Sequence, residues 1–343
     1  MNWGKNNMNK NLKKIIGVTT SMILSLCMLT GCSSNNSASS SSTSESSSSE
    51  QTTELPKQIN ITYVKAPLNV PSILEKNDSL FDEEFKSEGI KVNWSEITAG
   101  PDQTEALASG DIDFAHCLGG TSALIAASNG VDLKIIGAYS QAPKGFMLVT
   151  NDKNIKGPED LKGKKIGGPK GTILHQLLVA ALKDKDLSID DVEYMDMQIP
   201  DAVTSLGSGD IDCALVAGPA ALQCLNSGST KVCDGEGLVS GITVIAVNSE
   251  FADKYPDLVK RFMKVHEDTL DYMEKNYDEM ISKVAKELDI SEDDVKSLYE
   301  WYDFDDDIDD EEIKALYDTQ DFLIENKMQD KEIKIEDYIL DVE

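Results

Sequence analysis

The sequence predicts an α/β protein made of two similar lobes, and three observations lead to this prediction. Strand patterns alternate with helical patterns from residue 58 onward, as they do in parallel α/β sheets. One segment of the chain returns 99 residues later in nearly the same form, which indicates two units of the same build. Residues 56–343 are also too many for one small core and suit two lobes.

The N-terminal residues are predicted to be a targeting segment. Lys10, Lys13 and Lys14 precede an apolar run over residues 15–29, which has the length of a signal-peptide core and is short for a membrane-spanning helix. The run ends in Leu29-Thr30-Gly31-Cys32, which resembles the lipobox of bacterial lipoproteins. The resemblance implies that residues 1–31 are a signal peptide and that Cys32 carries lipid, which would anchor the chain to the extracytoplasmic face of the cell membrane.

A tether is predicted over residues 32–56. Twelve of the eighteen residues from Ser33 to Glu50 are serine, so this segment has almost nothing apolar to bury and is expected to stay disordered. It would hold a folded body away from the membrane surface. Both Met1 and Met8 fit as the start of translation.

The charge excludes some classes of partner. The net charge is −29, and the four lysines ahead of Cys32 leave −33 for the remainder, so we expect no nucleic-acid partner. An anion site must therefore be local and built mainly from backbone donors. Arg261, the only arginine, falls in a predicted helix beyond the cleft strands, which argues against a bidentate arginine clamp.

The cysteines remaining after the signal segment and Cys32 show no metal-ligand spacing, so we expect neither a metal centre nor a cofactor. They are Cys117, Cys213, Cys224 and Cys233. A disulfide between Cys224 and Cys233 is left open.

The first lobe opens with an alternating strand over 58–64. A helix is predicted near 72–88, a second strand over 91–97, and a turn at Thr98-Ala99-Gly100-Pro101 that leads into a helix through Leu107.

The repeat follows. Residues 105–115 return as residues 204–214, and each copy reads as a helix end, a Gly-Asp turn and a short strand. Small-residue loops at 118–122 and 217–220 then open two apolar helices. Because ligands bind beyond the carboxyl ends of parallel strands, we expect a cleft between these loops.

A third stretch, residues 164–178, has a strand, a glycine-rich turn and a helix that Thr172 can cap. The free N–H groups of such a helix start favour an anion, and Gly171 allows a ligand to approach the backbone. The alternative is a simple capped turn with no ligand.

These motifs together resemble the solute-binding proteins of ABC importers, in the nitrate/sulfonate/taurine and thiamine-precursor branch. The matching stretches are Gly110–Phe114, Asp160–Ile166, Lys170–Thr172 with His175–Leu178, and Gly209–Asp212, and the resemblance covers about residues 58–340. It implies a type II periplasmic-binding-protein fold, with two α/β lobes, a hinge and an interlobe ligand cleft. It also implies an extracytoplasmic protein, expected to be a monomer and not an enzyme, that delivers a small organic molecule to a membrane permease and its ATPase. The ligand would be sulfonate- or taurine-like, or thiamine-pyrimidine-like.

With that resemblance, residues 57–146 and 242–343 are predicted to form lobe 1 and residues 147–241 lobe 2. The chain would cross between them near Lys144–Val149 and Ile242–Val247, and two crossings make a hinge. A helical region from Phe251 onward carries an apolar stripe that should dock on lobe 1.

The predicted ligand contacts come from both lobes. The glycine-rich turn supplies Gly171, Thr172 and Ile173, and the equivalent helix start in lobe 1 supplies Gly120, Thr121 and Ser122. Topology alone adds five further residues, which are His116, Pro67, Asn69, Ser140 and Pro219.

The histidines are not interpreted as catalytic. A pair formed by His116 and His175 would suggest a metal or a general base, but packing or a hydrogen bond is the preferred interpretation for His175, and His266 is expected on a helix surface. The acidic run at 303–312 departs from a calcium loop, because Ile308 and Lys314 stand where glycine and glutamate are needed. We interpret it as a polar loop ahead of a helix over 311–322.

Two other functions remain open at this stage. One is a biosynthetic enzyme on the same scaffold, related to thiamine-pyrimidine synthase, although the cysteine-rich motif of those relatives is not found. The other is a sensor lipoprotein without a working pocket.

Overall fold

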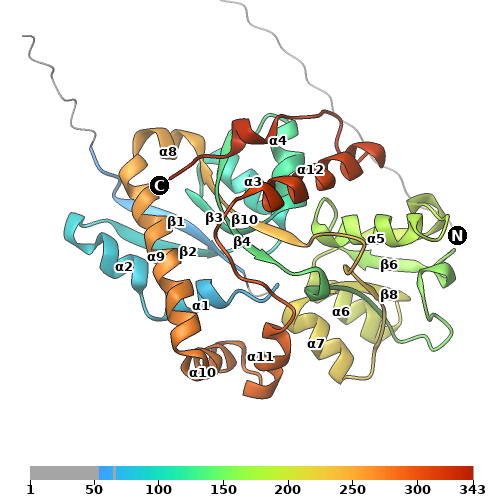
Figure 1. The fold of residues 1–343 in the computed structure, drawn as a ribbon. Helices are drawn as coiled ribbons and strands as arrows, with labels where there is room; N and C mark the ends of the chain where they lie inside the picture. The colour runs from blue at the N-terminus through green and yellow to red at the C-terminus, as the bar shows by residue number, and fades with distance from the viewer. Residues whose placement is uncertain (1–53, 65–66, 343) are drawn as a thin grey trace, which may run out of the picture. The chain divides into compact units, whose positions relative to one another are not determined.

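The computed structural model describes residues 54–64 and 67–342 (Figure 1). The predicted signal peptide, the lipobox with Cys32 and most of the serine-rich tether lie outside the described residues. Within the described part of the chain, every helix is too short or too polar to cross a membrane.

The first sheet has five strands in the order β2-β1-β3-β10-β4. These strands are β1 (Gln58–Tyr63), β2 (Lys91–Glu96), β3 (Phe114–Gly119), β4 (Leu133–Gln141) and β10 (Ile242–Asn248). β1 runs parallel to β2 and β3, whereas β10 runs antiparallel to β3 and β4.

The second sheet repeats this arrangement in the order β7-β6-β8-β5-β9. Its strands are β5 (Phe146–Thr150), β6 (Lys165–Gly168), β7 (Glu193–Asp196), β8 (Cys213–Ala217) and β9 (Thr230–Asp234). β6 runs parallel to β7 and β8, and β5 runs antiparallel to β8 and β9. The predicted α/β class is therefore confirmed. Both sheets are mixed, because the strand that follows each passage of the chain between the two sheets runs antiparallel to its neighbours.

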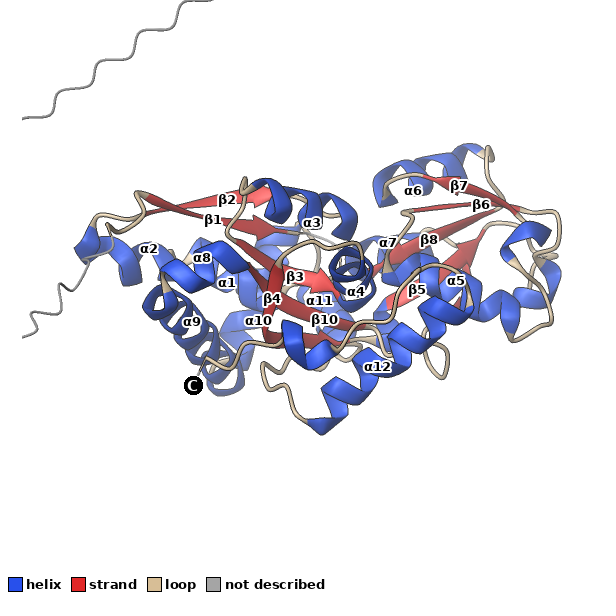
Figure 2. Cartoon of the chain, turned by 90° about the horizontal axis from the view of Figure 1, so that it is seen from above, coloured by secondary structure: helices blue, strands red, loops and turns tan. Residues whose placement is uncertain are grey.

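Helices follow the parallel strands of both sheets. Those on the first-sheet side are α1 (Val70–Asn77), α2 (Leu80–Phe85), α3 (Gly100–Ser109), α4 (Gly120–Ser128) and α8 (Ser249–Lys254). Those of the second sheet are α5 (Ile173–Lys183), α6 (Ile199–Ser208) and α7 (Gly218–Asn226). Figure 2 shows α5 and α6 on opposite faces of the second sheet.

The C-terminal region is helical, as expected. It contains α9 (Pro256–Lys275), α10 (Tyr277–Leu288), α11 (Glu292–Tyr299) and α12 (Asp310–Glu325). Leu258 and Phe262 of α9 pack in the core of the first sheet, whereas Val295 and Leu298 of α11 share a core with strands of the second sheet. The C-terminal helices therefore contact both sheets rather than the first alone.

The chain passes to the second sheet between β4 and β5 and returns between β9 and β10. We propose on this basis that residues 147–241 act as one lobe and that residues 57–146 and 242–343 act as the other.

Two predicted elements differ from the structure. The helix expected over residues 72–88 is broken, because Ser79 adopts a left-handed conformation with φ of 57° between α1 and α2. The strand expected to end at Ala115 continues to Gly119, and α4 begins at Gly120 with no loop between them.

The sequence repeat has a structural cause. Gly110 and Gly209 end α3 and α6 with φ of 75° and 80°, a conformation that glycine adopts without steric cost. Asp113 then accepts a hydrogen bond on its carboxylate from the Asn60 N–H at 2.7 Å, and Asp212 accepts one from the Lys165 N–H at 2.8 Å. Each Gly-Asp-Ile-Asp motif thus fastens a helix end to the first parallel strand of its sheet.

We predict that Asp113→Ala destabilises the protein by about 1.5–3 kcal/mol, the range for losing a hydrogen bond to a charged acceptor. Its carboxylate also accepts from the Asn60 side chain at 3.1 Å. Asp111→Ala is the matched control, because among the described residues this exposed carboxylate accepts only from the nearby Ser109 hydroxyl. Urea unfolding measures both changes, and equal losses for the two variants would contradict this role of the motif.

Candidate ligand-binding cavity

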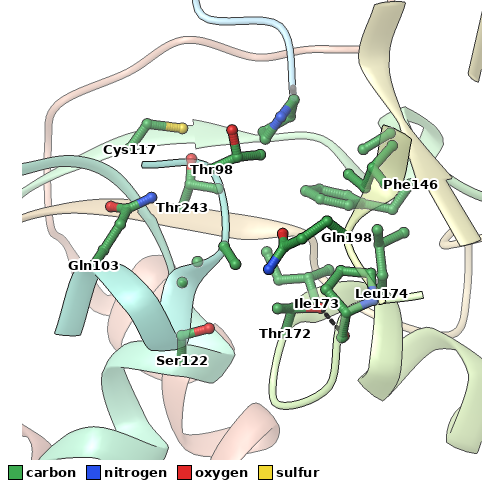
Figure 3. Close-up of a pocket in the computed structure, with 17 residues that line it drawn as sticks. Thr98, Gln103, Cys117, Ser122, Phe146, Thr172, Ile173, Leu174, Gln198 and Thr243 are labelled. Atoms are coloured by element: carbon green, nitrogen blue, oxygen red, sulfur yellow. Dashed lines mark hydrogen bonds between the residues drawn. The ribbon is translucent and has the colours of Figure 1, made fainter. Parts of the chain in front are cut away.

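A cavity lies where the strands of both sheets end (Figure 3). Parallel strands of both sheets lead into its wall at their carboxyl ends, and the antiparallel strands β5 and β10 begin there. The lining residues from the first-sheet side are Pro67, Thr98, Ala99, Gly100, Gln103, Cys117, Gly119, Ser122 and Thr243. Those from the second-sheet side are Phe146, Pro169, Thr172, Ile173, Leu174, Gln198, Ile199 and Ala217.

None of the described residues that line the cavity has a charged side chain. The polar groups are hydroxyls and two amides. Gln103 and Gln198 reach toward the cavity from opposite sides (Figure 3). Gln103 is only 1% exposed, and its Oε1 atom has no hydrogen-bond partner within the described part of the chain. Figure 3 shows the amide nitrogen of Gln103 on the cavity side and its oxygen turned away, so the group that this side chain offers a ligand is an N–H donor.

Five helices begin at the cavity wall. The N-cap residues of α3, α4, α5, α6 and α7 all line it, and they are Ala99, Gly119, Thr172, Gln198 and Ala217. Only Thr172 caps its helix with its side chain, accepting from the His175 N–H at 3.5 Å. The first N–H groups of a helix have no partner inside it, and the helix dipole places partial positive charge there. The cavity therefore favours an anion without a cationic side chain.

Gly100 permits two of these helix starts to approach each other. A Cβ atom at this position would lie 2.2 Å from the Ser122 Oγ atom, a distance that real atoms do not tolerate. Glycine at the first residue of α3 is thus required for α3 and α4 to begin at the same wall.

Two hydrogen bonds join α4 to the segment around the start of α5. The Ser122 hydroxyl donates to the Gly171 carbonyl oxygen at 2.8 Å, and the Thr121 hydroxyl donates to Gln176 Oε1 at 2.5 Å. These bonds connect the first-sheet and second-sheet sides at one edge of the cavity.

The structure brings some of the predicted contact residues together. Pro67, Ser122, Thr172 and Ile173 line the cavity. Gly120, Thr121, Gly171 and Pro219 lie in the same turns but are not among the lining residues.

Two predicted contacts lie behind the wall. The buried Asn69 side chain donates to the Val64 carbonyl oxygen at 2.6 Å. The Ser140 hydroxyl pairs at 2.8 Å with that of Thr243, which is itself a lining residue.

The sequence reasoning missed Thr98, Gln103, Gln198 and Thr243. The sequence did contain a signal for three of the helix starts at the cavity. The helices α3, α6 and α7 each have proline in the first turn, a position where the missing N–H of proline costs nothing.

His116 does not line the cavity. Its ring is fully buried on β3, beside Glu75 and His266, and burial lowers its pKa well below the usual range. The expectation that His266 lies on the surface is wrong, because it is 0% exposed on the face of α9 that packs under the first sheet. Arg261 pairs with Glu84 and Glu88, away from the cavity.

His175 has the structural role expected for it. Its ring stacks on Tyr194 with centroids 4.9 Å apart, and its Nδ1 atom accepts from the Gly171 N–H at 3.3 Å. Burial, aided by the charge of Lys170, lowers the pKa of His175 to about 4.

The described cysteines are free thiols, so Cys224 and Cys233 form no disulfide in this structure. Cys117 lines the cavity, and burial raises the pKa of its thiol to about 12.

Comparison with known proteins places these features in context. A family model described as NMT1/THI5 like matches residues 85–280. The chain is 31% identical over 250 residues to a taurine-binding periplasmic protein of Escherichia coli strain K12, an alignment that covers 70% of this chain and 76% of that protein.

Solved structures confirm the predicted fold. The alkanesulfonate-binding protein SsuA from Xanthomonas axonopodis pv. citri, bound to MOPS, superimposes with a TM-score of 0.76 at 24% identity, covering 83% of this chain and 99% of that chain. The same fold carries an enzyme, since the desulfurization enzyme DszB superimposes with a TM-score of 0.61 at 18% identity, covering 83% of this chain and 97% of that chain.

The pKa of His175 predicts a loss of stability in acid. The unfolded chain binds the His175 proton below about pH 6.5 and the folded chain only near pH 4, so this contribution is complete above pH 6.5 and is lost as the pH falls toward 4. Between pH 7 and pH 5 the loss is about 2 kcal/mol.

His175→Asn, which keeps an acceptor near the Gly171 N–H, should flatten the pH dependence of urea unfolding by that amount. The variant keeps the acid sensitivity contributed by His116. Curves for the variant and the wild type that run parallel from pH 7 to pH 5 would refute the assignment.

Proposed function

The chain belongs to the NMT1/THI5-like family, and from this membership we propose that it is the extracytoplasmic solute-binding component of an ABC importer. Its cavity captures a small molecule with a sulfonate group, such as taurine or an alkanesulfonate, and the protein delivers it to a membrane permease and ATPase. The relative named as taurine-binding and the neighbour named as alkanesulfonate-binding support this ligand class.

The observation that carries the proposal is the meeting of five helix starts at an uncharged cavity. A sulfonate stays ionised at physiological pH and offers three acceptor oxygens, which match free backbone N–H groups, hydroxyls and amide N–H groups. A taurine zwitterion has no net charge and suits walls that have none. A neutral pyrimidine would leave the positive ends of the helices without a counter-charge.

The second candidate function is an enzyme. The thiol of Cys117 in the cavity favours it, but the protonation state of that thiol argues against catalysis. Cys117 places a potential nucleophile in the cavity, and the desulfurization enzyme shares the fold. The attacking species would be the thiolate, however, and a thiol with a pKa of about 12 is protonated at neutral pH. The cavity thus supports capture of a ligand without chemical change.

The proposal includes the attachment of the protein to the membrane. Lipid on Cys32 anchors the chain to the extracytoplasmic face, and the serine-rich tether gives the folded body reach toward the permease. The protein acts as a monomer. The periplasmic location of the taurine-binding relative supports an extracytoplasmic address.

We predict that taurine or a short alkanesulfonate raises the melting temperature of the protein, whereas pyrimidines and thiamine do not. Binding should be measured by calorimetry, and the ligand recovered unchanged by mass spectrometry. Stabilisation by a pyrimidine alone would overturn the sulfonate proposal, and recovery of a desulfonated product would favour the enzyme.

The substitution Gln103→Leu is expected to lower the affinity for the ligand without lowering the stability of the folded protein. We expect the affinity for the sulfonate to fall about tenfold or more, because a donor to a charged group is lost. Unfolding without ligand should become no easier, because the substitution also removes a buried amide oxygen that has no partner within the described residues. Gln223→Leu, at an exposed position on α7, is the control and should leave the affinity unchanged. Unaltered affinity in Gln103→Leu would remove this residue from the site.

For the lipid anchor, we predict that Cys32→Ser moves the protein from the membrane fraction to the soluble fraction and abolishes labelling by a fatty acid. Cys27→Ser should leave both properties intact, because Cys27 falls within the predicted signal peptide. Retention of the label in Cys32→Ser would exclude this attachment site.

A further inference from the structure

Three ionisable side chains meet in the interior on the first-sheet side, apart from the cavity. Glu75 comes from α1, His116 from β3 and His266 from α9, and each is 0% exposed. We propose that these residues supply three of the ligands of one divalent transition-metal ion of the zinc class, at a site that the sulfonate function does not use.

The donor atoms have the spacing of a coordination sphere. His266 Nδ1 lies 2.8 Å from Glu75 Oε1 and 3.2 Å from His116 Nε2, and one ligand atom from each residue lies within 4.8 Å of the other two. Bonds of about 2.0–2.1 Å in a tetrahedral site hold neighbouring ligand atoms roughly 3.3 Å apart. Two imidazoles and one carboxylate are also a ligand set that zinc uses in proteins.

The surroundings fit His116 as a ligand through Nε2. Its other nitrogen, Nδ1, lies 3.2 Å from the Ser72 hydroxyl, which can accept the remaining ring proton, and 3.3 Å from Glu75 Oε2. Ser72 is held in turn by the Tyr139 hydroxyl at 2.8 Å. Such hydrogen bonds orient metal-binding histidines and set their tautomer. His266 binds through Nδ1, and its Nε2 atom has no hydrogen-bond partner among the described residues.

Charge balance points in the same direction. Within the described part of the chain, the ion-pair partners of Glu75 are the two imidazoles, and no lysine or arginine reaches it. A fully buried carboxylate is costly unless a cation or a proton compensates it. A divalent ion supplies that charge and replaces the mutual contacts of the three side chains with metal bonds.

The site is enclosed by rings. Tyr139 stacks on His266 with centroids 5.4 Å apart, and Phe262 and Phe81 meet the His116 ring edge to face. The metal would therefore enter while the chain folds and would contribute to folding stability, as structural zinc does.

The test begins with the wild-type full chain. The protein is unfolded in chelator, refolded with Zn²⁺, Co²⁺ or chelator, and dialysed before metal analysis. We expect about one metal ion per chain, visible Co²⁺ absorption typical of nitrogen and oxygen ligands, and a melting temperature several degrees higher with zinc than with chelator.

The variants locate the site. Glu75→Gln and His266→Gln should lose the metal. His175→Gln, which changes the one histidine of the sequence that lies outside the cluster, should retain it. A wild-type chain with no metal above the chelator background, and with the same melting temperature in zinc and chelator, overturns the proposal and assigns a shared proton to the cluster. Metal retained by Glu75→Gln, or lost by His175→Gln, overturns it as well. Sulfonate binding is measured separately on the same samples, so its success or failure does not affect this result.

Discussion

The direction of the parallel strands is the constraint on which the arrangement of this protein depends. In both sheets, helices that follow parallel strands start at the same edge, so their backbone N–H groups point to one region. The two sheets share one strand order, and segments from both meet at the cavity. Five helix starts are therefore collected there without any requirement on side-chain type. The described residues of the wall are uncharged, so the backbone provides the electrostatic potential there.

This constraint explains how so acidic a chain suits the binding of an anion. The charge of −33 beyond the signal segment is spread over the surface, and salt screens it over about 8–10 Å. Helix N-termini act within the first turn and at hydrogen-bond distance, where solvent is excluded and screening is weak. The proposed function therefore needs neither a lysine nor the single arginine, whose guanidinium group is already paired with Glu84 and Glu88.

The parts of the fold that local chemistry determines could be predicted from the sequence. The turn at Thr172 was identified because a cap and glycines act within a few residues, and the repeat was identified because Gly110 and Gly209 end their helices in the same way. Gln103 and Gln198 were missed because they meet at one cavity only through the packing of helices that are distant in sequence.

The position of His116 shows how a small error at a strand end changes a site. The predicted strand stopped at Ala115, which placed His116 at the edge of the cleft. β3 continues to Gly119, and Cys117 adopts a positive φ of 74° where the pairing of β3 with β10 is irregular, so Cys117 lines the cavity while His116 is buried beside Glu75 and His266.

His266 was expected on a helix surface, although its helical spacing predicts burial. It follows the fully buried Phe262 by four residues and so lies on the same face of α9. That face packs against α1 and brings His266 to Glu75. β3 consequently has two neighbouring residues with different roles, Cys117 on the cavity wall and His116 in the buried cluster. A metal ion that joins α1, β3 and α9 would also fix the strand from which the cavity wall is built. The ligand site uses backbone dipoles at the strand ends, whereas the buried cluster uses side chains within the core, so one strand can support both without sharing a functional group.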